Sequence, residues 1–160
     1  FYAEQKVRTL LEIKKNLNSS STDLIWARIF YPYGPGQDTR RLIPKLINSL
    51  NSNELFKLAD ISSIYDWIST RDIASAISWA AKHNLPFEVD IGTGTGVNNL
   101  EILGKLEEIL GRKARFSSDL KHEFGLKQRF VVSAESPILK AGWKPQDNLN
   151  SGLSWMVNNA

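Results

Sequence analysis

The feature that most constrains the fold is the segment of residues 23–30, which is mostly apolar and rich in β-prone side chains. A short apolar run without strict alternation is typical of a strand buried on both faces, and such strands belong to parallel sheets covered by helices. Residues 31–37 follow with two prolines and two glycines, which predicts a rigid loop at the carboxyl end of this strand. Because ligands bind at that end of open α/β sheets, we expect a binding site there.

The rest of the chain alternates helical patterns with short β-prone segments, as in an α/β protein. These patterns predict helices over residues 1–17, 40–50, 73–83, 100–110, 136–141 and 149–157, and strands over 54–58, 63–68, 87–91 and 130–133. Asp72 and Asn98 are suited to cap two of the helices, and Gly111 is suited to end one. Residues 113–135 otherwise carry little pattern. No start signal precedes the first helix, so we expect the chain to begin inside an element.

Composition argues against several classes of function. The 160 residues are 42% hydrophobic and 23% charged, which are ordinary values for a globular domain, and no apolar run approaches the ~20 residues of a membrane span. Cys is absent and the only histidines are His83 and His122, so we expect no metal site. The net charge of +3 is mild, and we expect no nucleic acid partner. Residues 1–12 resemble an amphipathic helix rather than a secretory signal, which favours a cytoplasmic protein.

Tyr2 and Lys6 are four residues apart on the first predicted helix and therefore share one face of it. An ammonium group beside a phenol favours the phenolate, which suits a tyrosine to act as a general acid or base on an alcohol or carbonyl. This spacing alone is common by chance in helices, so its weight depends on the motifs that follow it.

Gly92, Gly94 and Gly96 follow a predicted strand and precede a helix, which is a pattern that suggests nucleotide binding. The dinucleotide fingerprint requires a further glycine where this chain has Val97, and it requires an acidic residue about ~20 residues on, which is absent. We therefore interpret these glycines as a tight turn into a helix.

Six motifs occur in an order that resembles the extended short-chain dehydrogenase/reductase family, which comprises sugar-nucleotide epimerases, dehydratases and reductases. They are Tyr2 with Lys6, Arg28 with Tyr33-Gly34-Pro35-Gly36, Tyr65-Asp66-Trp67, Asp72-Ile73-Ala74, Asp90-Ile91-Gly92 with Gly94, and Ala141-Gly142-Trp143-Lys144-Pro145. The resemblance covers nearly the whole chain. The family's glycine-rich dinucleotide loop lies upstream of its catalytic tyrosine and is not in this sequence, so the chain resembles the C-terminal half of such an enzyme.

The resemblance implies an α/β fold made of the C-terminal part of a Rossmann-type parallel sheet with a small mixed α/β substrate-binding lobe. Residues 1–36 would belong to the dinucleotide-binding domain. Residues 37–160 would form mainly the substrate-binding lobe, with residues 71–92 returning a helix and a strand to the Rossmann domain.

The resemblance also implies roles for individual residues. Tyr2 would move a proton to or from a sugar oxygen, and Lys6 would bind the nicotinamide ribose of NAD or NADP. Cofactor contacts are expected from Phe30, Tyr31 and Pro32, and contacts to a nucleotide-diphosphate sugar from Tyr31, Arg40, Arg41 and Arg129. Cationic side chains are needed there because a diphosphate is anionic. The residues Asp66, Trp67 and Trp143 are expected to be structural rather than catalytic.

Three positions depart from the family pattern. Gln5 stands where serine is frequent, Tyr31 where many members have an asparagine that touches the sugar nucleotide, and Tyr65 where an arginine is often associated with the phosphates. We therefore expect an NAD(P)-dependent nucleotide-sugar epimerase or reductase, present as a C-terminal fragment. Members of the family often dimerise, so the resemblance also implies a possible homodimer. The alternative is a non-catalytic binding or regulatory protein of the same fold. NAD versus NADP, and epimerase versus reductase versus dehydratase, stay open.

Overall fold

The computed structural model describes residues 1–17, 23–58, 61, 63–118 and 128–159. Its helices are α1 (Tyr2–Leu17), α2 (Leu42–Ser52), α3 (Thr70–Ala80), α4 (Asn99–Leu110), α5 (Pro137–Lys140) and α6 (Leu149–Asn158). Its strands are β1 (Trp26–Ile29), β2 (Tyr31–Tyr33), β3 (Leu55–Leu58), β4 (Ile64–Tyr65), β5 (Trp67–Ser69), β6 (Glu88–Ile91), β7 (Val97–Asn98), β8 (Arg115–Ser118) and β9 (Arg129–Phe130).

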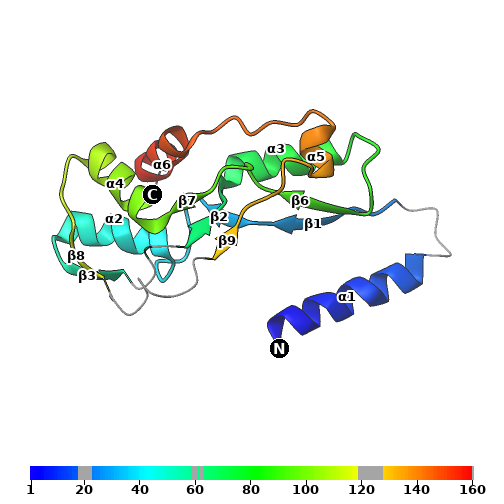
Figure 1. Ribbon diagram of the computed structural model, residues 1–160, viewed down its shortest axis with the longest axis horizontal. Coiled ribbons are helices and arrows are strands. Elements are labelled where there is room, and N and C mark those ends of the chain that lie inside the picture. The colour runs from blue at the N-terminus through cyan, green and yellow to red at the C-terminus, as the bar shows by residue number, and fades with distance from the viewer. Residues whose placement is uncertain (18–22, 59–60, 62, 119–127, 160) are drawn as a thin grey trace.

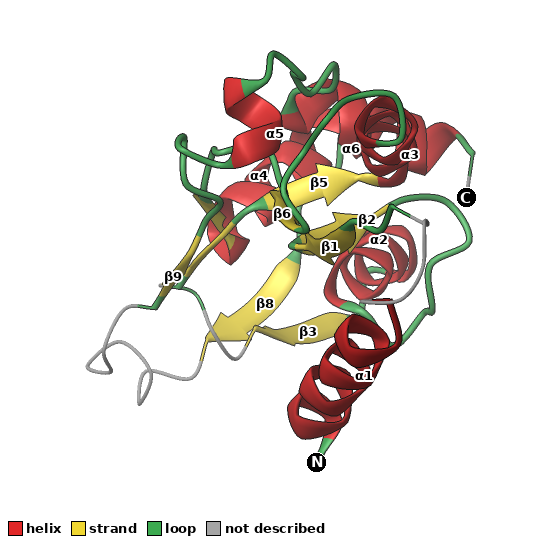
Figure 2. Ribbon diagram, turned by 90° about the vertical axis from the view of Figure 1, so that its right-hand side faces the viewer, coloured by secondary structure: helices red, strands yellow, loops and turns green. Residues whose placement is uncertain are grey.

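The strands pair mainly in parallel, which confirms the predicted α/β class. Strand β1 pairs with β6, β2 with β5, and β3 with β8, all in parallel, and β4 lies between antiparallel β7 and parallel β9. Figures 1 and 2 show α3 and α5 on one side of the β1–β6 pair and α1 on the other. The pair therefore lies between helices on both sides.

Two hydrophobic clusters stabilise this arrangement. One joins Tyr33 to the facing sides of α2, α4 and α6, and includes the fully buried Leu106 and Leu153. The other lies between α3, β5, β6 and α5, and includes Ile68 and Trp143. Because burial of apolar surface is the main favourable term in folding, these clusters fix how the segments at the strand ends meet.

Local signals placed α4 correctly. Asn98 caps the helix: its side chain accepts from the Glu101 N–H while the Glu101 carboxylate accepts from the Asn98 N–H. Gly111 ends the helix in the left-handed conformation at φ 63°. The helices predicted over residues 1–17, 136–141 and 149–157 are also confirmed, within three residues at each end.

The predicted cap of α3 is wrong. Ser69, not Asp72, is the N-cap, because the Ser69 Oγ accepts from the Asp72 N–H at 3.1 Å. The buried Asp72 carboxylate instead accepts from the backbone N–H groups of Gln146 and Asp147. The helix accordingly begins at Thr70, before the predicted start.

Three strand predictions also need correction. Strand β1 is shorter than residues 23–30 and is not buried on both faces: Ile29 is 43% exposed, and α1, on the other side of the pair, has no buried residue. The segment 31–37, predicted as a loop, begins with strand β2, which pairs in parallel with β5. The single strand predicted over residues 63–68 is interrupted at Asp66, whose side chain points into the interior.

Candidate functional site

Asp66 organises the segments around the candidate site. Its side chain is fully buried, and its two oxygens accept four hydrogen bonds: from the Thr93 N–H at 2.8 Å, the Thr93 hydroxyl at 2.6 Å, the Gly94 N–H at 2.9 Å and the Val132 N–H at 3.1 Å. The carboxylate thus ties the β4–β5 junction to the glycine-rich turn and to the segment after β9. Asp66 is structural, in agreement with the expectation from the sequence.

The same contacts decide what the turn at residues 92–96 can do. A pyrophosphate site needs free backbone N–H groups at a helix N-terminus. Here the Thr93 and Gly94 N–H groups donate to Asp66, and the N-terminus of α4 is capped by Asn98. The turn is therefore a tight connection rather than a dinucleotide loop.

A cleft of about 570 Å³ lies beside this junction. Aromatic rings form much of its wall, and polar side chains come from the loop after β2 and from the start of α4. The lining residues are Tyr31, Pro32, Gln37, Asp38, Arg41, Leu42, Tyr65, Trp67 and Asn99. Three predicted site residues, Tyr31, Pro32 and Arg41, meet in this cleft. The segments that supply Gln37, Tyr65 and Asn99 are far apart in sequence, so no local signal pointed to them as a group.

The three predicted phosphate-binding arginines differ in their surroundings. Arg41 lines the cleft. Arg40 is bound to the Asp38 carboxylate by three hydrogen bonds of 2.5–3.0 Å, and its side chain is 86% exposed. Arg129 lies on β9, where it is exposed, and does not line the cleft. The structure therefore brings only one of the three to the cleft.

Tyr2 and Lys6 lie together on α1, as predicted, with the Lys6 Nζ 5.6 Å from the centroid of the Tyr2 ring. Tyr2 is 76% exposed, and neither residue lines the cleft. Phe30 follows β1, where its N–H donates to the Ile91 carbonyl at 3.0 Å, and it does not line the cleft either.

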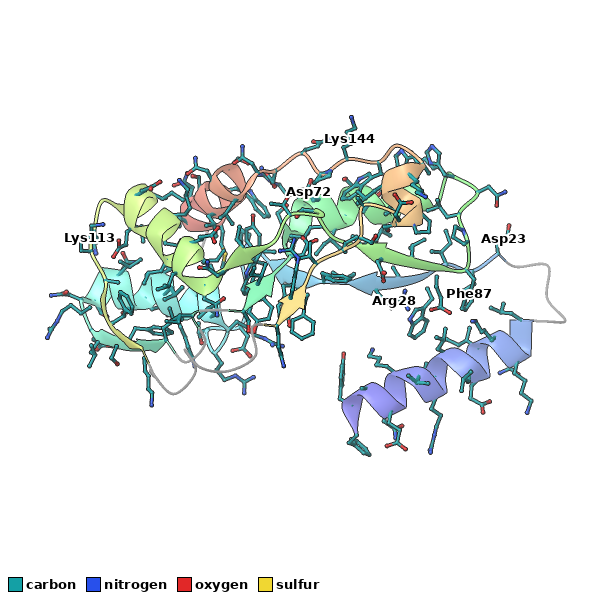
Figure 3. All side chains as sticks on the ribbon, viewed as in Figure 1. Asp23, Arg28, Asp72, Phe87, Lys113 and Lys144 are labelled. Atoms are coloured by element: carbon teal, nitrogen blue, oxygen red, sulfur yellow. The ribbon has the colours of Figure 1, made fainter. Side chains whose placement is uncertain are left out.

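Contacts at the other end of α1 fix how the helix lies on the sheet. Near the C-terminal end, the Lys14 Nζ is 3.0 Å from a Glu88 carboxylate oxygen and 4.3 Å from the Phe87 ring centroid. Arg28 adds a second ion pair to Glu88, and Figure 3 shows Arg28 and Phe87 on the side of the strands that faces α1. Figure 1 shows α1 running opposite to β1. At 1.5 Å per residue, Tyr2 is ~18 Å back along the axis from Lys14, toward the carboxyl ends of β1 and β6.

A smaller cavity of about 200 Å³ lies behind Trp67, lined among others by Tyr33, Thr93 and Asp147. Burial raises the pKa of Tyr33 far above its ordinary value, and the nearby Asp147 and Asp72 carboxylates raise it further. The Tyr33 phenol therefore stays protonated, which makes it a packing residue rather than a general base.

The part of the chain that the structure describes shows neither a metal-binding cluster nor a membrane-spanning helix. No group of three or more His, Asp or Glu side chains is placed to hold a metal ion. None of the described helices has the length and apolar character needed to cross a membrane.

The fold defines a Rossmann-like α/β protein, and its cleft lies where the chain passes from β1 to β2. The model of the NAD dependent epimerase/dehydratase family matches residues 1–92, which is more than half of the chain. The chain belongs to this family, and the resemblance noted in the sequence is confirmed.

Known proteins agree with this assignment. The low-salt glycan biosynthesis protein Agl12 of Haloferax volcanii is 26% identical over 159 residues, which cover 98% of this chain and 51% of that protein. The chain spans 36–51% of the length of the curated relatives that it matches.

Solved structures show the same fold. A UDP-N-acetylglucosamine 4-epimerase from Methanobrevibacter ruminantium, in complex with UDP-N-acetylmuramic acid, has a TM-score of 0.84 at 22% identity, over 98% of this chain and 52% of that one. A UDP-glucose 4-epimerase from Thermus thermophilus, in complex with NAD, has a TM-score of 0.81 at 21% identity, over 99% and 53%.

Proposed function

We propose that this chain forms the part of an NAD- or NADP-dependent nucleotide-sugar epimerase or reductase that carries the catalytic tyrosine and the substrate cleft. The observation that supports this most is the pairing of Tyr2 with Lys6 at the end of α1 nearest the carboxyl ends of β1 and β6. The cleft lies near the carboxyl end of β1, because Tyr31 and Pro32 begin β2, which starts two residues after β1 ends. Membership of the epimerase/dehydratase family adds independent support.

Each residue has a defined task in this proposal. The Tyr2 phenol moves a proton to or from the sugar oxygen. The Lys6 ammonium favours the phenolate form of its neighbour and binds the ribose hydroxyls next to the nicotinamide. Phe30, Tyr31 and Pro32 form the wall beside the nicotinamide ring. The cofactor, when bound, supplies the hydride chemistry, whereas the chain supplies orientation and proton transfer.

The proposed substrate is a nucleotide-diphosphate sugar, which is supported by the shared fold of a UDP-N-acetylglucosamine 4-epimerase and a UDP-glucose 4-epimerase. Arg41 is the cation of the cleft and binds a phosphate oxygen, which a guanidinium does through two parallel hydrogen bonds. Arg40 is already bound to Asp38 and contributes less. Arg129 would reach the ligand only from outside the cleft.

The division into domains is part of the proposal. Residues 1–36 and 71–92 belong to the dinucleotide-binding domain, and most of residues 37–160 form the substrate lobe. The two hydrophobic clusters follow this division with few exceptions. Tyr33 packs with α2, α4 and α6, whereas Ile68, Ile138 and Trp143 pack with α3 and β6. Separate cores are characteristic of separate structural units.

The decisive experiment replaces Tyr2 with Phe in the full-length protein and measures turnover of nucleotide sugars together with binding of NAD and NADP. The variant keeps the ring and loses the group that moves the proton, so the rate should fall by about 10²–10⁴-fold while cofactor binding is retained. In a parallel arm, Arg41→Gln should weaken nucleotide-sugar binding about tenfold, as loss of a charge-assisted hydrogen bond does, whereas Arg40→Gln should not.

Near-normal turnover by Tyr2→Phe would refute the catalytic role of Tyr2. Ligand binding without any turnover by the unaltered protein would favour the alternative, a non-catalytic binding or regulatory protein of the same fold.

A further inference from the structure

We propose that Tyr31 and Tyr65 form an aromatic platform on which the sugar ring of the substrate stacks, so that these two residues determine specificity. The inference rests on the proposed function and specifies which part of the substrate the aromatic wall of the cleft binds.

The platform is built by strand pairing. Tyr31 on β2 is the register partner of Trp67 on β5, and Tyr65 on β4 is the register partner of Phe130 on β9. Register partners place their side chains on the same face, where large rings are within reach of each other. The Tyr31 and Tyr65 ring centroids are 4.4 Å apart with the ring planes tilted by 56°, and Tyr31 lies 5.6 Å from Trp67 at the same tilt, so the rings form an angled wall rather than one flat surface.

The rings are held in position before any ligand binds. Phe130 stacks on Tyr65 at 5.8 Å and 8° between planes, although it does not line the cleft itself. Asp66 lies between Tyr65 and Trp67 in the sequence and is fixed by its four hydrogen bonds. A preorganised surface loses little conformational entropy on binding, which favours its use as a recognition surface.

The charges of the cleft argue for an uncharged ring at this wall. Arg41 and Asp38 are the charged residues that line the cleft, and the Asp38 carboxylate is paired with Arg40. A diphosphate has one cation to bind there, which leaves the aromatic wall for a neutral part of the ligand. The cleft volume of about 570 Å³ leaves room for a ring beside the phosphate.

A hexose fits this wall in two respects. The C–H bonds of one hexose face are apolar and pack against the negative face of an aromatic ring. The hydroxyls at its edge both donate and accept hydrogen bonds. Two lining residues keep a buried polar atom without a partner among the described residues: the donor Nε1 of Trp67 and the acceptor Oε1 of Gln37. Such atoms are stabilised when a ligand group pairs with them.

Position favours the sugar over the nucleobase. Tyr31 comes two residues after the end of β1, at the carboxyl end of the parallel pair. The proposed chemistry acts on the sugar, and it occurs at this end. The base lies at the opposite end of the diphosphate and therefore away from Tyr31.

The test uses the full-length protein and calorimetric titration with UDP-glucose and dTDP-glucose, each compared with the matching nucleoside diphosphate. Tyr31→Leu and Tyr65→Leu remove an aromatic face and should weaken binding of the nucleotide sugars about tenfold while binding of UDP and dTDP is unchanged. The matched controls Tyr31→Phe and Tyr65→Phe keep the face and should bind nucleotide sugars nearly as well as the unaltered protein.

Saturation-transfer NMR on the unaltered protein gives a second readout that does not depend on the folding of a variant. The strongest transfer should reach hexose protons on one face of the ring. Unchanged nucleotide-sugar binding by the Leu variants, an equal loss for UDP and dTDP, or strongest transfer to base protons would each overturn the platform and leave the proposed function standing. Absence of all nucleotide-sugar binding by the unaltered protein would overturn the platform and the proposed substrate together.

Discussion

Replacing Asp66 with Asn should destabilise the chain substantially, although the two side chains have almost the same shape. The carboxylate accepts two hydrogen bonds on each oxygen, from Thr93 on one and from Gly94 and Val132 on the other. An asparagine has one carbonyl oxygen, so its NH₂ group faces either the Gly94 and Val132 N–H groups or the N–H and hydroxyl of Thr93. The Thr93 hydroxyl can rotate to accept from the NH₂ group, so this second orientation is favoured and loses one hydrogen bond, that of the Thr93 N–H.

The size of the effect follows from the lost bond and from the lost charge. A hydrogen bond to a charged group contributes ~1.5–3 kcal/mol, one buried N–H is left unpaired, and the remaining bonds are made to a neutral group. Removing the negative charge offsets part of this loss, because a buried carboxylate is costly to desolvate. We expect a net loss of ~2 kcal/mol in the free energy of unfolding, which is a large share of the ~5–15 kcal/mol typical of a folded domain.

Urea unfolding of the purified chain, followed by far-UV circular dichroism, measures this loss as a lower midpoint at an unchanged slope. Glu108→Gln is the matched control, because it makes the same chemical change at a side chain that is 64% exposed, where ~0.5 kcal/mol or less is expected. Amide hydrogen exchange at Thr93 and Gly94 should accelerate in Asp66→Asn. A loss below ~1 kcal/mol, with exchange unchanged at both amides, would refute the role assigned to this carboxylate.

Two further predictions concern stability. Gly104→Ala in α4 should stabilise the chain by ~0.5–1 kcal/mol, because a Cβ there meets nothing within 4 Å. Gly152→Ala in α6 should destabilise the chain, because the new Cβ would clash with the Tyr33 hydroxyl. The urea midpoints of the two variants should therefore move in opposite directions. Burial alone would raise the pKa of Asp147, but hydrogen bonds from Ser69, Arg71 and Ser151 hold this pKa below its usual value of 3.8. The Asp147 carboxylate therefore stabilises the fold above pH 3.8, and this contribution is lost as the pH falls through the lowered pKa. Unfolding midpoints between ~pH 6 and ~pH 2 should therefore fall less steeply for Asp147→Asn than for the unaltered chain, and equal slopes would contradict the assignment.

The sequence predicted the helices better than the strands because helix signals are local. Asn98, Glu101 and Gly111 lie within or beside α4, and each acts on that helix alone. Strand β8 at residues 115–118 was not predicted, because its only partner in the described residues is β3, sixty residues earlier in the chain. Short strands of this kind form through pairing and not through their own propensity.

The candidate site divides in the same way. The order of motifs led to Tyr2, Lys6 and Tyr31, because each belongs to a short pattern with a fixed spacing. The sequence could not predict that Arg41 lines the cleft while Arg40 is paired, because the two residues are adjacent and share the same neighbours in sequence. The structure distinguishes them, because the Asp38 carboxylate accepts hydrogen bonds from the Arg40 N–H and guanidinium. The aromatic wall was also not predicted, because strand register determines which rings meet.

The structure connects the position of the phosphates to one buried carboxylate. In this chain the glycine-rich turn has its N–H groups bound to Asp66, so a phosphate at that turn would lose those donors and be repelled by the fixed negative charge. Arg41, which precedes β4 and β5 in the chain, places a guanidinium at the cleft instead. Asp66 therefore acts on ligand placement in two ways: it makes the turn unsuitable for an anion, and it fixes the strand junction that presents Tyr65 and Trp67 to the cleft. In the proposed complex, the phosphate of a nucleotide sugar therefore binds at Arg41 and its sugar ring packs against the aromatic wall.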